Sequence, residues 1–145
     1  MKVVIDTSVV VSAIKPEERF HNQSIAFLER VHEYGDEIWT PMTQLWEIGA
    51  ALDHPGKTPK GTKFHKFDEL HLQFVNVDQG LFQRTWKANL RVPVKAADRI
   101  FISCALDKGG ELVSWDDILV HYASAFGVNA QTPNTFLKNH PPKLE

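Results

Sequence analysis

Four carboxylates stand where the folding of an α/β chain would bring them together. Asp6 and Asp116 each follow a short apolar run, while Glu47 and Asp98 each lie on a segment with apolar residues at helical spacing. Open α/β sheets place their ligands beyond the C-terminal ends of the strands, so a fold that packs these runs side by side would gather the acids. A gathered set of carboxylates is typical of a site for a hard divalent cation.

Each acid also has a structural alternative. Asp6 could cap a helix, Glu47 could lie on a solvated helix face, and Asp98 could cap its helix or pair with Arg99 or Lys95. These alternatives weaken when the acids are taken together. Like charges in one pocket raise pKa values and reduce stability unless something positive lies between them.

Asp116 and Asp117 stand between an apolar run and a helical segment. One of the two is expected to cap the helix and the other to be free for chemistry. We predict Asp116, which is nearer the end of the strand, as the site residue, and assign Asp117 to the start of the helix.

The pattern of ligand types favours Mg²⁺ or Mn²⁺. Carboxylate oxygens without a His or Cys spacing suit these ions better than Zn²⁺. His65 and His71 are too far apart for one helical face, and Cys104 is the only thiol. Thr7 and Ser8 could hydrogen-bond a ligand carboxylate or could cap the helix that follows.

Short β-branched runs alternate with helical ones, which predicts an α/β fold with a largely parallel sheet. The predicted strands are 2–5, 38–40, 74–77, 111–114 and 128–131. The predicted helices are 9–14, 21–34, a helix after Thr43 with Leu45, Ile48 and Leu52 as its buried stripe, 64–72, 81–90, 98–108 and 118–126. The tail from Asn134 is expected to be mostly loop. On the helix from Asp98, the spacing of Phe101, Ile102 and Ala105 places the Asp98 side chain on the stripe that faces the sheet.

Length and charge set further limits. A chain of 145 residues with a net charge of −2 is expected to form a single domain over residues 1–140, with a tail over 141–145 that includes a cloning scar. The acidic balance argues against a globally basic nucleic-acid binder. The sequence offers neither a signal peptide nor a membrane span, and the single Cys104 fits a reducing compartment, so a cytoplasmic location is expected.

The ordered motifs resemble the PIN domain, and more narrowly the VapC-like toxins of toxin–antitoxin pairs. The resemblance rests on Val-Val-Ile-Asp-Thr-Ser at 3–8, Trp-Glu-Ile-Gly at 46–49, Ala-Ala-Asp-Arg-Ile-Phe-Ile-Ser-Cys-Ala at 96–105 and Glu-Leu-Val-Ser-Trp-Asp at 111–116. It runs in order from residue 2 to about residue 137.

The resemblance implies a three-layer α/β/α fold with a central, mostly parallel sheet of four to five strands. It places Asp6, Glu47, Asp98 and Asp116 at the family's acidic quartet, and Ser114 at a position where the family usually has Thr or Ser. It further implies a metal-dependent ribonuclease, a VapB-like antitoxin as partner, and a homodimer. The candidate surfaces for these partners are Ile25, Phe27, Leu28, Phe64 and Phe67.

Two basic strips could contact RNA phosphates or could simply be solvated. Their members are Lys57, Lys60, Lys63 and Lys66, and Arg84, Lys87, Arg91 and Lys95; Lys57, Lys60, Arg91 and Lys95 are the predicted contacts. Trp46 and Trp115 neighbour site acids and could stack an unpaired base, or could be core residues. Together with the ribonuclease activity that the resemblance implies, we expect cleavage at a single-stranded loop of a structured RNA, such as tRNA or rRNA.

Three alternative functions stay open. A non-toxin PIN nuclease in RNA processing and a catalytically silent metal-binding module both fit the four acids. A receiver-type phosphoryl-transfer domain fits less well, because Thr7-Ser8-Val9 supplies no second acid after Asp6.

Overall fold

A five-stranded, all-parallel sheet with the strand order β3-β2-β1-β4-β5 forms the centre of the molecule. The computed structural model describes residues 1–52, 70–89 and 94–144, apart from the side chains of residues 52 and 87–89. The strands are β1 (Lys2–Ile5), β2 (Glu37–Pro41), β3 (Gln73–Val75), β4 (Glu111–Val113) and β5 (Ala130–Gln131). The described helices are α1 (Thr7–Ile14), α2 (His21–Glu33), α3 (Gln44–Leu52), α5 (Gln79–Asn89), α6 (Ala96–Lys108), α7 (Asp117–Ala125) and α8 (Pro133–Asn139).

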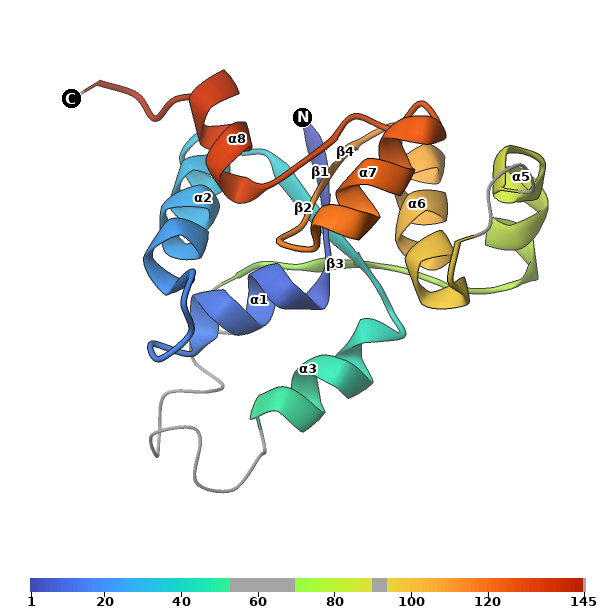
Figure 1. Ribbon diagram of the computed structural model, residues 1–145, viewed down its shortest axis with the longest axis horizontal. Coiled ribbons are helices and arrows are strands. Elements are labelled where there is room, and N and C mark those ends of the chain that lie inside the picture. The colour runs from blue at the N-terminus through green and yellow to red at the C-terminus, as the bar shows by residue number, and fades with distance from the viewer. Residues whose placement is uncertain (53–69, 90–93, 145) are drawn as a thin grey trace.

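Two hydrophobic cores lie on opposite faces of this sheet, because successive strand residues point to opposite sides. Val3 and Ile5 belong to the core shared with α1, α2, α3 and α8, whereas Val4 belongs to the core shared with α5, α6 and α7. Figure 1 shows α1, α2 and α8 on one side of the strands and α6 and α7 on the other. The expected three-layer α/β/α fold with a parallel sheet is thereby confirmed.

Helix α6 behaves as its sequence predicts. Phe101, Ile102 and Ala105 are buried against the sheet, and α6 contacts β1, β2 and β4. Its end at Gly109 follows from the backbone, because the φ of +62° at this residue lies in the left-handed region that glycine adopts readily.

The C-terminal tail differs from the prediction of loop. Thr132 accepts a hydrogen bond from the backbone N–H of Thr135 at 3.3 Å and so caps α8, which begins at Pro133. The Phe136 side chain is fully buried and packs edge-on against Phe27, with ring centroids 5.0 Å apart. The loop prediction is therefore wrong, and α8 completes the core beside α2.

Two predictions about exposure also change. Phe27 and Leu28 were expected at a partner surface, but both are buried, because α2 packs against α1 on one side and α8 on another. Leu45 was expected in the buried stripe of α3 but is 37% exposed, while Gln44 and Ile48 point inward. Phe64, Phe67, most of the predicted helix 64–72 and the Leu52 side chain lie outside the described residues.

Candidate metal and nuclease site

The candidate site lies at the C-terminal edge of the sheet, where β1 and β4 run side by side. In the sheet, β2 lies on one side of β1 and β4 lies on the other. The strand order therefore reverses at the end of β1. Ligands of open α/β sheets bind at such points. Figure 1 shows that α1 begins and α3 lies at this edge, and that α6 and α7 both start near it.

Asp6 is the buried centre of the site. It directly follows β1, and only 7% of its surface is exposed. Ser8 Oγ donates to Asp6 Oδ1 at 2.6 Å, and Ser114 Oγ donates to Asp6 Oδ2 at 2.7 Å. Although Asp6 occupies the N-cap position of α1, its side chain does not cap the helix. Of the two alternatives for Thr7 and Ser8, helix capping does not hold, because α1 begins at Thr7 itself.

Burial, with a smaller effect of the charge of Asp116, raises the pKa of the Asp6 carboxyl from 3.8 to about 6, against the opposing effect of the hydrogen bonds from Ser8 and Ser114. Burying a charged carboxylate is unfavourable without a compensating positive charge. A cation bound at Asp6 would supply that charge. The buried carboxylate therefore fits a metal ligand better than a helix cap.

Ser114 links two of the predicted acids. This fully buried residue donates to Asp6 and accepts a hydrogen bond from the backbone N–H of Asp116 at 2.9 Å. Ser8 has a matching role, because its Oγ also accepts from the backbone N–H of Trp115 at 3.2 Å. The two serines thus hold the end of β1 against the segment that follows β4.

Asp116 caps α7. Its Oδ1 accepts from the backbone N–H groups of Ile118 at 2.9 Å and Leu119 at 3.2 Å. The assignment of the cap to Asp117 is therefore wrong, because Asp117 is the first helical residue and is exposed. The cap uses one oxygen of Asp116, and the other makes no hydrogen bond among the described residues. One carboxylate can serve both the helix start and a ligand.

Asp98 lies in the first turn of α6 and is half-buried. Burial raises the pKa of its carboxyl, and the charge of Asp116 raises it further, while Lys95 opposes both effects. Since Asp116 also raises the pKa of Asp6, the three carboxyl groups belong to one electrostatic cluster. This mutual repulsion is the signature expected of a cation site.

Glu47 reaches the site through Thr7. Thr7 Oγ1 donates to Glu47 Oε2 at 2.9 Å and also hydrogen-bonds the side chain of Gln44. A hydroxyl has a single proton, so Thr7 donates it either to Glu47 Oε2 or to the side-chain oxygen of Gln44. Glu47 itself is exposed. Thr7 therefore connects α3 to the residue that follows Asp6.

Gln44 is the residue that sequence reasoning missed. It is 3% exposed and packs its amide against Thr7, 37 positions away in the chain. From the sequence, a polar residue at the start of a helix is expected at the surface. Gln44 is buried because α3 approaches α1. The only indication in the sequence was that Gln44 lies close to Glu47 and Ile48 on the same predicted helix.

The side chains do not yet form a complete ligand cage. Among the described residues, no group of three or more His, Cys, Asp or Glu side chains lies close enough together to hold a metal ion. The donor chemistry nevertheless fits Mg²⁺ or Mn²⁺, because the clustered groups are carboxylate and hydroxyl oxygens. The four ligands and the metal stay predictions.

The predicted RNA contacts divide between described and undescribed residues. Lys95 is exposed immediately before α6, three positions from Asp98. Lys57, Lys60 and Arg91 lie outside the described residues. In the second strip, Arg84 forms an ion pair with Asp107 at 2.6 Å, so part of its charge is already balanced.

The two tryptophans beside site acids have different surroundings. Trp115 stacks on Phe20, with ring centroids 4.1 Å apart, and its indole N–H donates to Ser24 Oγ at 2.8 Å. This residue is part of the packing. Trp46 is 83% exposed.

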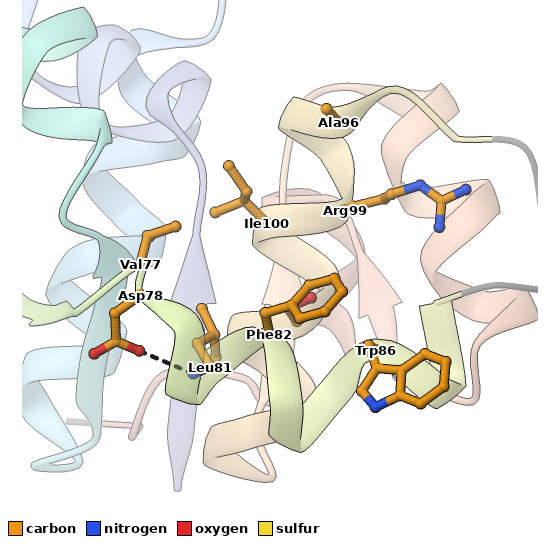
Figure 2. A pocket seen from close by; sticks show the side chains of 9 residues that line it. Val77, Asp78, Leu81, Phe82, Trp86, Ala96, Arg99 and Ile100 are labelled. Carbon is orange, nitrogen blue, oxygen red and sulfur yellow. Dashed lines mark hydrogen bonds between the residues drawn. The ribbon is translucent and has the colours of Figure 1, made fainter.

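An apolar groove of about 280 Å³ lies between α5 and α6, away from the acids. Phe82 and Trp86 line it from α5, and Ala96, Arg99 and Ile100 line it from α6 (Figure 2). These α6 residues are on a different face from Phe101, Ile102 and Ala105, which pack on the sheet. The groove is therefore a surface separate from the acidic cluster.

Comparison with known proteins agrees with this architecture. The family model of the PIN domain matches residues 3–125. A PilT N-terminus domain protein from the hyperthermophilic archaeon Sulfolobus solfataricus P2 has a similar structure, with a TM-score of 0.60 and 12% identity over 100% of this chain and 98% of that one. VapBC2 from Rickettsia felis, bound to a DNA fragment from its promoter, gives a TM-score of 0.63 and 16% identity over 91% of this chain and 98% of that one. No curated protein matches significantly. None of the described helices has the length and apolar character needed to cross a membrane.

Proposed function

This chain belongs to the PIN domain family, and from that premise we propose that it is a Mg²⁺- or Mn²⁺-dependent endoribonuclease that acts as the toxin of a toxin–antitoxin pair. PIN domains are generally nucleases. The observation that carries the proposal is the buried Asp6 carboxylate, held by two serines at the sheet's switch point and repelled by Asp116. A buried carboxylate that a neighbouring carboxylate repels is unfavourable by itself and becomes favourable when a bound cation balances its charge.

The ligands in this proposal are Asp6, Glu47, Asp98 and Asp116. A divalent ion held by these residues would supply a nucleophilic water at neutral pH and would balance charge on the scissile phosphate. The protein's own contribution is positioning. Ser8 and Ser114 fix both oxygens of Asp6, the α7 cap orients Asp116, and Thr7 orients Glu47.

The proposed substrate is a structured RNA such as tRNA or rRNA, cleaved at a single-stranded loop, where bases can be splayed out. Lys95 is exposed beside Asp98 and is suited to a phosphate contact. Lys57, Lys60 and Arg91 are proposed as further contacts. We propose that the protein acts in the cytoplasm, because the buried free thiol of Cys104 fits a reducing compartment.

The proposed partners are a VapB-like antitoxin and a second copy of the chain. The toxin assignment draws support from the similarity in fold to VapBC2, which was solved as a complex with DNA. The groove between α5 and α6 is suited to protein contact, because Phe82 is 64% exposed and stacks near Trp86. Contiguous exposed apolar surface of this kind marks interaction sites.

Cleavage by purified variants tests the proposal. Asp6→Ala, Glu47→Ala, Asp98→Ala and Asp116→Ala are each expected to abolish Mg²⁺-dependent cleavage of a loop-containing RNA and to relieve growth arrest on expression. Asp117→Ala is the matched control, because its carboxylate is exposed and neither caps α7 nor contacts Asp6. Asp116→Ala also removes a helix cap, so circular dichroism must confirm that this variant is folded.

The same experiment separates the alternatives. Cleavage that persists in all five variants would rule out the nuclease site. Folded wild-type protein that binds Mg²⁺ without cleaving any RNA would favour the silent interaction module, and cleavage without growth arrest would favour a role in RNA processing.

A further inference from the structure

Trp46 is exposed to an extent unusual for its size. Its side chain is 83% exposed, although α3 carries Gln44 and Ile48 on a buried face. Met42 and Leu45, which are 39% and 37% exposed, lie four and one positions before it. Met42 lies in the turn that precedes α3, and Leu45 is the neighbour of Trp46 on the helix. An indole is a large apolar surface, so one left in water beside other apolar residues indicates a binding surface.

This surface adjoins the acidic site. Trp46 directly precedes Glu47, and consecutive Cα atoms are about 3.8 Å apart. Glu47 is hydrogen-bonded to Thr7, which follows Asp6. Trp46 is therefore one residue from a proposed metal ligand, and both side chains are exposed on the same turn of α3.

Gly49 leaves room on the same side of α3. It follows Leu45 by four residues and Trp46 by three, and a Cβ added there would meet no heavy atom within 4 Å. Glycine weakens a helix relative to alanine, and no contact within the described residues requires it here. Its effect is an open space next to the indole. Met42, Leu45, Trp46 and Gly49 are called the Trp46 shelf.

The charges of the shelf and of the neighbouring acids indicate which kind of ligand would bind to the shelf. All four shelf residues are uncharged, whereas the adjoining cluster carries the negative charges of Asp6, Asp98, Asp116 and Glu47. A nucleotide divides in the same way, because its base is neutral and planar while its phosphate needs the cation held by the acids. Base–aromatic stacking is the usual means by which proteins hold unpaired bases.

We propose that Trp46 is a specificity-determining residue that stacks an unpaired RNA base next to the phosphodiester to be cleaved. This inference rests on the proposed nuclease function and adds a position at which the enzyme contacts the substrate's base. Trp46 supplies a flat π-face and the gap over Gly49 supplies the space for a ring.

The test is a double-mutant cycle between protein and RNA. The probe is a fluorescein-labelled RNA hairpin with a single-stranded loop, together with versions that each lack one loop base. With wild-type protein, removal of the stacked base should weaken cleavage by about 5- to 100-fold through a higher KM. With Trp46→Leu, the intact RNA should already show that loss, and removal of the same base should cost nothing further. Trp46→Phe should restore the dependence on the base, since only the aromatic face is needed.

The outcomes are distinct from those for the function itself. If wild type cleaves but every base-deleted RNA is affected equally in wild type and Trp46→Leu, the stacking role is overturned and the nuclease stands. If wild type cleaves nothing, the nuclease proposal fails, and fluorescence anisotropy of the same RNAs decides stacking by the same cycle. If Trp46→Leu cleaves like wild type but escapes inhibition by a co-expressed antitoxin, the shelf binds protein and the proposal is overturned.

Discussion

Replacing Asp6 by Asn should stabilise the metal-free protein at neutral pH while it abolishes activity. Asn has almost the same shape and carries no charge, so it removes the unfavourable burial of a carboxylate. It can still accept a hydrogen bond from one of the two serines that hold Asp6. No helix cap is lost, because the Asp6 side chain makes no capping bond.

The magnitude follows from the pKa of Asp6, which burial raises from 3.8 to about 6. Each tenfold change in an acid constant corresponds to about 1.4 kcal/mol. The folded protein holds this proton more tightly than the unfolded chain, so its stability falls as pH rises from about 4 to about 6, by about 3 kcal/mol in all. Asp6→Asn should recover about 1–3 kcal/mol of that loss above pH 7. The gain should vanish near pH 4, where Asp6 is already neutral.

Urea unfolding at pH 8 and pH 4, in EDTA, measures both values. Asp117→Asn is the matched control, because it neutralises an exposed carboxylate in the same region and should change stability little. An Asp6→Asn protein that is less stable than wild type at pH 8, or one whose gain is equally large at pH 4, would refute the reasoning.

Three further predictions concern the same site and the α5–α6 groove. Millimolar Mg²⁺ or Mn²⁺ should raise the melting temperature of wild type by mass action, and Asp6→Asn or Asp98→Asn should reduce that gain; a melting curve indifferent to metal would count against the site. Ser114→Ala removes a hydrogen bond that lowers the pKa of Asp6, so the acidic limb of the pH–rate profile for RNA cleavage should move to higher pH, and an unmoved limb would contradict this role. Phe82→Asp should convert a dimer to a monomer in light scattering without loss of helical signal; a wild-type protein that is monomeric at high concentration would exclude the dimer.

The sequence predicted best where local pattern and tertiary packing agree. The β-branched run of β1 and the apolar spacing of α6 are each buried on the side that periodicity indicates. The arrangement of Asp6 and Asp116 at the ends of neighbouring strands then follows from the parallel pairing of β1 and β4. The burial of β1 and α6 depends on residues close together in the chain, whereas the pairing of β1 with β4 joins distant segments whose parallel order the alternation of strands and helices predicts.

Two of the failures have long-range causes, and the third has a local one. The burial of Phe27 depends on Phe136 of α8, which is far away in sequence, and the role of Gln44 depends on its contact with Thr7. Helix α2 is covered on two sides, by α1 and by α8. Positions that would be exposed on a helix with one buried stripe are therefore buried here and cannot contact a partner. The choice between Asp116 and Asp117 as cap depends on a backbone angle, because an extended residue before the helix directs its side chain to the free N–H groups.

Sequencing of RNA 5′ ends in cells after brief expression tests the central claim most directly. Wild-type protein should produce new ends at one or a few single-stranded loops of a structured RNA, and Asp98→Asn, expressed at the same level, should produce none. Identical ends in both strains, or no new ends with wild type, would contradict cleavage by this acidic cluster.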